Sequence, residues 1–426
     1  MMFILPFTFS IDASTYAYSY ARNRLISDNK HGCAYLFLLD DQLWILPTKK
    51  STVNPTLDLP SVSVIVPAYN EEGSIEPTVK ALYDQTLMPK NVIVVDDCST
   101  DRTPEICQIL RKELGDKFIY IRRERNSGKA SNINYVMKEF SGQLGEITLI
   151  NDSDTIPDKT CIEKLARNFT SDDVAAATPF GYTTPPLNAL ARALHYGNAW
   201  NNSIFKFRKK AQGFRGGISV VCGACTAYRT NVLHELPIPE RTKTEDTDYT
   251  WILQENGYKV VYDENAVAHS RDLGRPTALL RQWFRWYCGT MQSIYVHGKQ
   301  LLKARSLFWT TVLPATVESL PYAFGVFTLP ILLILNLAMP TGGVPYFSLS
   351  YVKGFLLADF LFTAIPTAII SPKYLLRLPQ IYFYKYVASS LTLVAFLKTA
   401  YEGATGQRHR WSNTWARKSN FNAQQN

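Results

Sequence analysis

The feature that most constrains this chain is an alternation of strand-like and helix-like segments across residues 61–270. Short β-branched runs predict strands, and segments with helical apolar spacing lie between them. The strands are expected at Val62–Val66, Val92–Val95, Phe118–Ile121 and Ile147–Ile150, and the helices at Ser74–Leu87, Thr103–Leu114 and Ser131–Phe140. This alternation predicts an α/β domain with a mostly parallel sheet and helices on both faces. Ligands bind at the carboxyl ends of strands in such sheets, so the residues after each strand are the candidates for a site.

Acidic side chains follow three of these four strands. They are Glu71 and Glu72 after the first, Asp96, Asp97 and Asp101 after the second, and Asp152 and Asp154 after the fourth. Carboxylates gathered at one edge repel one another unless a cation or hydrogen-bond donors compensate. In an extended segment Asp152 and Asp154 point to the same side, and hard oxygen ligands beside open positions suit Mg²⁺ or Mn²⁺ bridged to a diphosphate. An isolated Asp-x-Asp is more often a solvated turn, but the two other acidic strand ends favour a metal site.

The third strand is followed by Gly128 and Lys129. Glycine lets the backbone approach a ligand closely, and lysine offers a positive charge to a phosphate. The glycine spacing of a Walker loop is missing, as is the serine or threonine after the lysine. The pair is therefore a weak phosphate signal when taken alone.

Charge is distributed unevenly along the chain. Leu320–Ala338 has no charged residue in nineteen positions, close to the roughly 20 apolar residues that span a bilayer core, and predicts a transmembrane helix. Val344–Ile370 predicts a second span, in which Asp359 would have to face other helices or a polar cavity. Ile381–Leu397 predicts a third span or an interfacial helix. The basic tail after residue 401 favours the cytoplasmic side, so an even number of spans would place tail and soluble domain together.

Composition excludes several classes of protein. With 46% hydrophobic residues the 426-residue chain is too apolar for intrinsic disorder, and seven cysteines are too few for a disulfide framework. Cys222 and Cys225 lack the second pair that a zinc site would need. A net charge of +9 is compatible with nucleic acid. The acidic strand ends and apolar stretches argue instead for membrane lipid, against which the basic run 201–215 would also fit.

Six segments, in this order, resemble the inverting family-2 glycosyltransferases. They are VIVPAYNEE (64–72), VVDDCSTD (94–101), NSGKASNIN (126–134), NDSDT (151–155), TEDTD (244–248) and RQWFRW (281–286). Within that family the set is similar to the membrane-bound synthases of cellulose, hyaluronan, chitin and poly-N-acetylglucosamine. Gln282, Arg285 and Trp286 form the signature of this branch. The resemblance implies a GT-A-type, Rossmann-like domain followed by interfacial helices and C-terminal transmembrane helices.

The resemblance also assigns roles to the matching positions. For the donor, Tyr69 would stack on uracil, Glu71 and Asp97 would hold the nucleoside, and Lys129 would lie near the nucleotide sugar. Asp152 and Asp154 would bind nucleotide and metal, and Arg285 would point to the diphosphate. Asp246 would be the general base with Glu245 beside it, and the acceptor would be lined by Cys222, Gln282 and Trp286. These residue types suit an inverting transfer, which needs a base for the acceptor hydroxyl and positive charge on the leaving group.

The resemblance implies transfer of a sugar from a UDP-sugar onto a growing β-linked polysaccharide, with Mg²⁺ or Mn²⁺ as the cofactor. The enzyme would be a multi-pass protein of the cell membrane, and its catalytic domain would face the cytoplasm. One alternative is transfer of a single sugar to a lipid or short oligosaccharide. An inactive membrane-bound sensor or scaffold is another, and the complete motif set argues against it. Related synthases usually have transmembrane helices ahead of the catalytic domain, which residues 1–58 do not show. A translocation channel would therefore need a homo-oligomer or a membrane partner, and no nucleic acid is expected.

The expected organisation has five parts. Residues 1–58 form a region without a recognisable motif, 59–270 the catalytic domain, 271–312 amphipathic interface helices, 313–400 the membrane region with two or three spans, and 401–426 a basic tail.

Overall fold

The computed structural model describes most of the expected catalytic domain and part of the C-terminal region. Its described residues are 59–303 except 215, 216 and 272, then 349–407, the strands at 34–39 and 42–47, and the single residues 328, 331, 334 and 411. The chain divides into two compact units. One comprises residues 58–187, 212–310 and 395–426, and the other comprises residues 1–57, 188–211 and 311–394.

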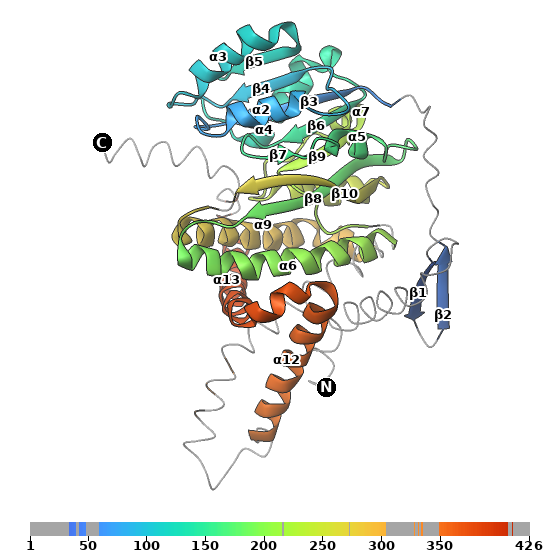
Figure 1. Cartoon of the computed structure of the whole chain (residues 1–426), viewed down its shortest axis with the longest axis vertical. Helices are drawn as coiled ribbons and strands as arrows, with labels where there is room; N and C mark the ends of the chain where they lie inside the picture. Colours follow the sequence, from blue (N-terminus) through green and yellow to red (C-terminus); the bar gives the residue numbers. More distant parts are fainter. Residues whose placement is uncertain are drawn as a thin grey trace. The chain divides into compact units, whose positions relative to one another are not determined.

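The first unit contains an eight-stranded sheet (Figure 1). The strands are β3 (Val62–Ala68), β4 (Val92–Asp96), β5 (Phe118–Arg122), β6 (Ile147–Asn151), β7 (Ile156–Pro157), β8 (Val174–Thr184), β9 (Cys225–Arg229) and β10 (Lys259–Arg271). They lie in the order β5-β4-β3-β6-β9-β8-β10-β7. The four strands predicted from the sequence are β3 to β6, and their ends agree within two residues.

The sheet is mixed but mostly parallel, as the sequence predicted, because all of its strands except β7 and β9 run in the same direction. β3 pairs in parallel with β4 and β6, β4 with β5, and β8 with β10. β9 runs antiparallel to both β6 and β8, and β7 antiparallel to β10. The reason for the reversal is that β9 starts where β6 ends: Asn151 is the register partner of Cys225, and the Asp152 amide donates to the Ala224 carbonyl at 2.7 Å. A strand that enters at the carboxyl edge of its neighbour must run back along it.

Alternate residues of the central strands pack into two cores, as the two-residue period of a strand requires. Val64 and Val94 enter one core, and Ile65 and Ile93 enter the other. The first core is covered by α2 (Ile75–Tyr83), α3 (Thr103–Leu114) and α5 (Cys161–Ala166), and the second by α4 (Lys129–Glu139), α7 (Thr230–Glu235) and α8 (Glu245–Glu255). The predicted helices on both faces of the sheet are thus confirmed, and α4 and α8 bring candidate site residues to the same face.

A long helix, α9 (Pro276–Lys303), packs against the start of α8. A Cβ atom at Gly289 would lie 2.2 Å from the Thr244 Oγ1, which is closer than any real contact, whereas a Cβ at Gly298 of the same helix would meet nothing within 4 Å. Glycine at 289 therefore permits the close approach of α9 to the residue that precedes α8.

Gly289→Ala is expected to destabilise the protein, because the new methyl group forces Thr244 away from α9 and overpacking typically costs about 1–3 kcal/mol. The matched variant Gly298→Ala should leave stability unchanged or raise it by up to about 1 kcal/mol, the helix-propensity difference between the two residues. Urea unfolding of both variants and the parent measures the difference. Equal stability of the two variants would contradict the close approach.

The second unit contains most of three long helices, α6 (Ala189–Phe214), α12 (Leu349–Ile370) and α13 (Leu378–Ala404), with a 3-10 turn at Pro372–Arg377 between the last two, and the hairpin β1 (Ala34–Leu39) and β2 (Gln42–Pro47). The Trp200 indole Nε1 donates to Thr367 Oγ1 at 2.8 Å and ties α6 to α12. The Lys385 ammonium on α13 donates to Asp359 Oδ1 at 2.6 Å and to Thr363 Oγ1 at 2.9 Å on α12. Asp359 thus faces another helix, as predicted.

The structure describes only part of the predicted membrane spans. Leu320–Ala338 lies outside the described residues apart from three single positions. The stretches Val344–Ile370 and Ile381–Leu397 overlap α12 and α13. Among the described residues, no helix combines the length and the apolar character needed to cross a bilayer.

Candidate active site

The loops after β3 and β4 are tied together at the carboxyl edge of the sheet. Asn70 has a positive φ of 56°, which asparagine tolerates better than most residues. Its amide donates to Ser99 Oγ at 2.9 Å, and its side-chain oxygen accepts the Thr100 amide at 2.8 Å. The next residue, Glu71, donates its amide to Thr103 Oγ1 at 2.8 Å. These bonds fix the turn that carries Tyr69 and Glu71, two of the three residues predicted to hold a nucleoside.

Asp97 holds the loop that precedes α4. Its Oδ1 accepts the Ser127 amide and its Oδ2 accepts the Gly128 amide, both at 2.8 Å. Gly128 has a φ of 91°, a left-handed conformation that favours glycine. The structure therefore uses both carboxylate oxygens of Asp97 to place Lys129, the first residue of α4. A nucleoside contact by Asp97 would have to share these oxygens.

Lys129 lies at the centre of the site. Its ammonium is 2.5 Å from Asp152 Oδ1, 2.6 Å from the Gly223 carbonyl and 3.6 Å from Glu245 Oε1. Burial opposes the charge, but Asp152 and Glu245 outweigh it and raise the pKa of the lysine above its ordinary value. The lysine is thus a permanent cation that joins β6, the β9 entry loop and α8.

Three carboxylates crowd the neighbouring strand ends. Burial raises the pKa of Asp154, and the charge of Asp152 raises it further. Burial also raises the pKa of Glu71, with added repulsion from Asp154 and Asp152, while a 2.5 Å hydrogen bond from Ser74 Oγ to Glu71 Oε2 opposes the shift. Because these groups repel one another, a cation bound among them would be stabilised.

The chemistry of this carboxylate group fits a divalent metal. Asp152 and Asp154 supply hard oxygen atoms. Burial and the charge of Asp152 raise the pKa of Asp154, and Lys129 only partly opposes this shift. Among the residues that the structure describes, no three His, Cys, Asp or Glu side chains are arranged as a complete metal site. A metal held here would therefore take its remaining ligands from water or from the diphosphate of a substrate.

Asp246 lies in the first turn of α8, where the helix dipole favours negative charge. The Thr247 amide donates to its Oδ1 at 2.8 Å. Burial raises the pKa of Asp246 to about 6, with a further contribution from Glu245, while Lys129, the Thr247 amide and Arg285 oppose the shift. A Cβ atom at Gly223 would lie 2.5 Å from Asp246 Oδ2, so a glycine lets the carboxylate approach the β9 entry loop.

A small pocket connects these groups. It is lined by Lys129, Ile133, Ile150, Gly223, Thr226, Tyr228, Ile238, Glu245, Asp246 and Tyr249. The lining includes the lysine and the two carboxylates of α8. It also includes apolar side chains, which lower the local dielectric and strengthen the interactions among the charges.

The residues predicted for the acceptor are placed along α9 and near β9. The Arg285 Nη1 donates to the Lys243 carbonyl at 3.3 Å, just ahead of α8. Gln282 is half-buried, and the Trp286 side chain is 39% exposed. The Cys222 amide donates to Thr178 Oγ1 at 2.7 Å.

The structure brings part of the predicted set into one cluster. Lys129, Asp152, Glu245 and Asp246 interact directly or lie in the same pocket, and the charges of Asp154 and Arg285 act on members of this group. The roles predicted for these residues, and for Tyr69, Cys222, Gln282 and Trp286, remain predictions. Sequence reasoning missed the pocket residues Thr226, Tyr228 and Tyr249, because no motif marks them.

Comparison with known proteins agrees with the family suggested by the motifs. Residues 63–237 match the family model described as Glycosyl transferase family 2. The matched part is less than half of the 426-residue chain. It contains β3 to β9 and the residues Lys129, Asp152 and Asp154, whereas Asp246 and Arg285 lie beyond it.

Curated relatives match the chain at low identity. An uncharacterized glycosyltransferase, YaiP, of Escherichia coli is 25% identical over 269 residues, which cover 62% of this chain and 65% of that protein. The probable glycosyltransferase YdaM of Bacillus subtilis is 27% identical over 263 residues, covering 58% and 59%. A poly-β-1,6-N-acetyl-D-glucosamine synthase of Staphylococcus aureus is 24% identical over 245 residues, covering 57% of each. The chain spans about three fifths of the length of these relatives.

Among solved structures, the chain is similar to the mannosyltransferase PcManGT from Pyrobaculum calidifontis, determined with GDP-Man and Mn²⁺. The TM-score is 0.57 at 18% identity, and the match covers 91% of this chain and 98% of the other. At this identity the likeness shows a common fold.

Proposed function

We propose that this chain is a glycosyltransferase that moves a sugar from a nucleotide donor to an acceptor hydroxyl in one inverting step. The observation that carries the proposal is the cluster at the carboxyl edge of the sheet. In it, Lys129 lies 2.5 Å from Asp152 and 3.6 Å from Glu245, and Asp246 lines the same pocket. The family match over residues 63–237 supports the same reaction class.

Asp246 serves as the general base. Its pKa of about 6 leaves it mostly ionised at neutral pH, yet basic enough to take a proton, as an efficient base requires. As the acceptor oxygen forms its bond to the anomeric carbon, its proton passes to Asp246 and the bond from that carbon to the phosphate oxygen breaks. The electron pair leaves with the nucleoside diphosphate, and a single displacement inverts the configuration of the carbon.

Arg285 and Lys129 supply fixed positive charge near the leaving group. Preorganised charge of this kind stabilises the developing negative charge on the diphosphate. Asp152 and Asp154 would hold Mg²⁺ or Mn²⁺, and such a cation, when bound, neutralises charge on the phosphate oxygens. Because Lys129 lines the pocket and contacts Asp152, its ammonium holds that carboxylate beside the pocket.

The finer assignment is a UDP-sugar donor and a β-linked polysaccharide product made at the cytoplasmic face of the cell membrane. Similarity to the Staphylococcus aureus synthase and the signature Gln282, Arg285 and Trp286 support a polymer product. Exposed apolar side chains on α12 support contact with lipid; they are Leu356, Leu357, Phe360, Leu361 and Ile365.

The test is a donor panel assayed with membranes from cells that produce the chain. UDP-glucose, UDP-N-acetylglucosamine, UDP-glucuronate and GDP-mannose are supplied with Mg²⁺ or Mn²⁺, and the products are separated by size. A ladder of polymer lengths from one UDP-sugar, with activity in the membrane fraction, is the expected result. Addition of one sugar would favour a lipid or oligosaccharide acceptor, and no transfer from any donor would overturn the proposal.

A further inference from the structure

A group of four charged side chains, built around two fully buried ones, joins α8 to α9, and the proposed reaction does not yet use it. The side chains of His297 on α9 and Asp248 on α8 are 2% and 0% exposed. His297 Nε2 lies 2.7 Å from Asp248 Oδ1, and Nδ1 lies 2.8 Å from Glu255 Oε1. Arg241 donates from Nε and Nη2 to the two oxygens of Asp248 at 3.0 and 2.9 Å. We call these four residues the α8–α9 clasp.

The geometry of the clasp matches a charged imidazole. A neutral ring donates one hydrogen bond, whereas both nitrogens of His297 face carboxylate oxygens, which only accept. With Arg241, the charged ring brings the clasp to zero net charge. The 3.3 Å between Arg241 Nη2 and His297 Nε2 separates two donors that share Asp248 Oδ1. Burial opposes the charge, but the hydrogen bonds to Asp248 and Glu255 raise the pKa of His297 above its ordinary value.

One side chain of α9 thereby holds both ends of α8. Asp248 lies in the first turn of α8 and Glu255 is its last residue, a separation of roughly 10 Å along the helix axis. Between them Trp251 packs edge-on against the His297 ring, with centroids 5.5 Å apart, and donates its Nε1 to the Ser219 carbonyl at 2.7 Å. The clasp therefore fixes the whole helix and not a single turn.

Further contacts fix the segment just ahead of α8 to the same face of α9. Gln292 Oε1 accepts the Lys243 amide at 3.0 Å, and Gly289 abuts Thr244. Arg285 lies one helical turn before Gly289 and bonds the Lys243 carbonyl. Contacts with α9 thus position both the start of α8, where Asp246 lies, and its end.

We propose that His297 is a positioning residue that, in its charged form, holds α8 on α9 and so sets the placement of the Asp246 carboxylate relative to Arg285. This inference rests on the proposed function. The charged groups that face the ring are Asp248 and Glu255 from α8 and Arg241 from the segment ahead of it. When the ring loses its proton at higher pH, one carboxylate loses its donor and the clasp loosens. The transfer rate should then fall on the alkaline side.

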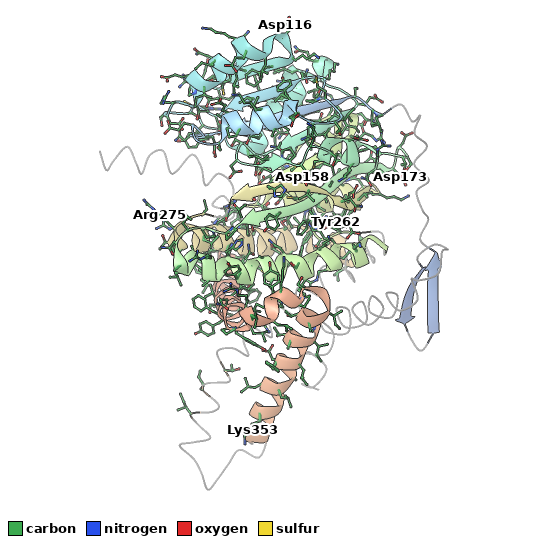
Figure 2. The ribbon with its side chains drawn as sticks, in the orientation of Figure 1. Asp116, Asp158, Asp173, Tyr262, Arg275 and Lys353 are labelled. Carbon is green, nitrogen blue, oxygen red and sulfur yellow. The ribbon has the colours of Figure 1, made fainter. Side chains whose placement is uncertain are left out.

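The test compares the pH dependence of kcat in His297→Gln, His297→Lys and the parent. Glutamine removes the charge, so we expect kcat to fall about 10-fold or more near neutral pH, with KM for the donor nearly unchanged and the alkaline fall in rate lost. Lysine keeps a positive charge to a pKa near 10 in its ordinary state, so the alkaline fall should move to higher pH. His269→Gln is the matched control. Its ring pairs with Asp158 (labelled in Figure 2) and its side chain is 39% exposed, so the profile should not change.

Two outcomes would overturn the inference: a pH profile of His297→Gln identical to the parent, or an alkaline fall in His297→Lys at the parent's pH. If the glutamine variant does not fold, the lysine variant decides. Failure of the proposed function is recognised separately, because the parent would then transfer no sugar. In that case an NMR titration of the histidine rings in the parent decides the clasp, and a His297 ring that is neutral at pH 6.5 contradicts it.

Discussion

Asp246→Asn should lower the rate of sugar transfer by about 10³-fold, within the usual contribution of a general base, and leave nucleotide binding within about twofold of the parent. The amide keeps the shape of the side chain and can still accept the Thr247 amide hydrogen bond. It cannot take a proton from the acceptor hydroxyl. Replacing a carboxylate whose pKa is raised by burial and by Glu245 also removes repulsion, so the variant should fold at least as well as the parent.

The measurement is initial rate with the active donor, alongside calorimetric titration with the nucleoside diphosphate. Asp116→Asn is the control, because this exposed aspartate (labelled in Figure 2) lies in the 3-10 turn after α3 and does not line the pocket. Its rate should equal that of the parent. Parent-like turnover in Asp246→Asn would remove Asp246 from the role of base and leave the nucleotide site untouched.

The same carboxylate determines the acid side of the pH profile. The reaction needs Asp246 without its proton, so the parent's kcat should rise as the pH increases through about 6. In Asp246→Asn the residual rate should lack this rise, because the amide does not titrate. Together with the alkaline fall assigned to His297, the parent's profile is expected to be bell-shaped.

The sequence was sufficient to predict the strands and the acidic strand ends, because both follow from local patterns. A strand of β-branched residues such as Val92–Asp96 is buried on both faces, and Asp96 and Asp97 then lie at its carboxyl end in any parallel arrangement. The clustering of Lys129 with Asp152 follows from the same topology. These features need only short-range pattern and the rule that parallel strands end at one edge.

The antiparallel strand β9 and the clasp were not predictable in this way. Whether β9 is parallel or antiparallel to β6 depends on the edge of the sheet at which the long segment between residues 184 and 225 returns. No local sequence pattern encodes that edge. His297 lies 42 residues from Glu255 and 49 from Asp248, and a lone histidine on a helix has no spacing that identifies its partners. Gly289 and Gly298 look alike in the sequence, and only packing against Thr244 distinguishes them.

Asp97 shows that a residue of a motif can have a structural role that the motif does not specify. Its place in the family pattern implies a contact with the nucleoside, which stays a prediction, and its two oxygens also accept the Ser127 and Gly128 amides. A carboxylate that orders a loop looks the same in the sequence as one that binds a ligand. In this structure Asp97 acts on the site through Lys129, because the loop that Asp97 orders positions Lys129 to contact Asp152.

Asp154→Asn should reduce transfer by about 10²–10³-fold, comparable to the loss of a principal electrostatic stabiliser of the leaving group. It should also abolish the binding of Mn²⁺ that the parent shows in the presence of nucleoside diphosphate. The expected effect on stability has the opposite sign. Burial and the charge of Asp152 raise the pKa of Asp154. The ionised form of Asp154 therefore destabilises the folded state, and this destabilisation is present once the pH rises above the pKa of Asp154 in the folded protein.

Without metal at pH 7, Asp154→Asn should therefore unfold at the same temperature as the parent or higher. Added Mn²⁺ with nucleoside diphosphate should raise the melting temperature of the parent but not that of the variant, since only a ligand of the folded state stabilises it. Thermal unfolding with and without Mn²⁺, and the same pair of scans on Asp116→Asn, make the comparison. A variant that loses stability without metal would mean that Asp154 is a structural residue. A variant that still gains stability from Mn²⁺ would mean that the cation is held without Asp154.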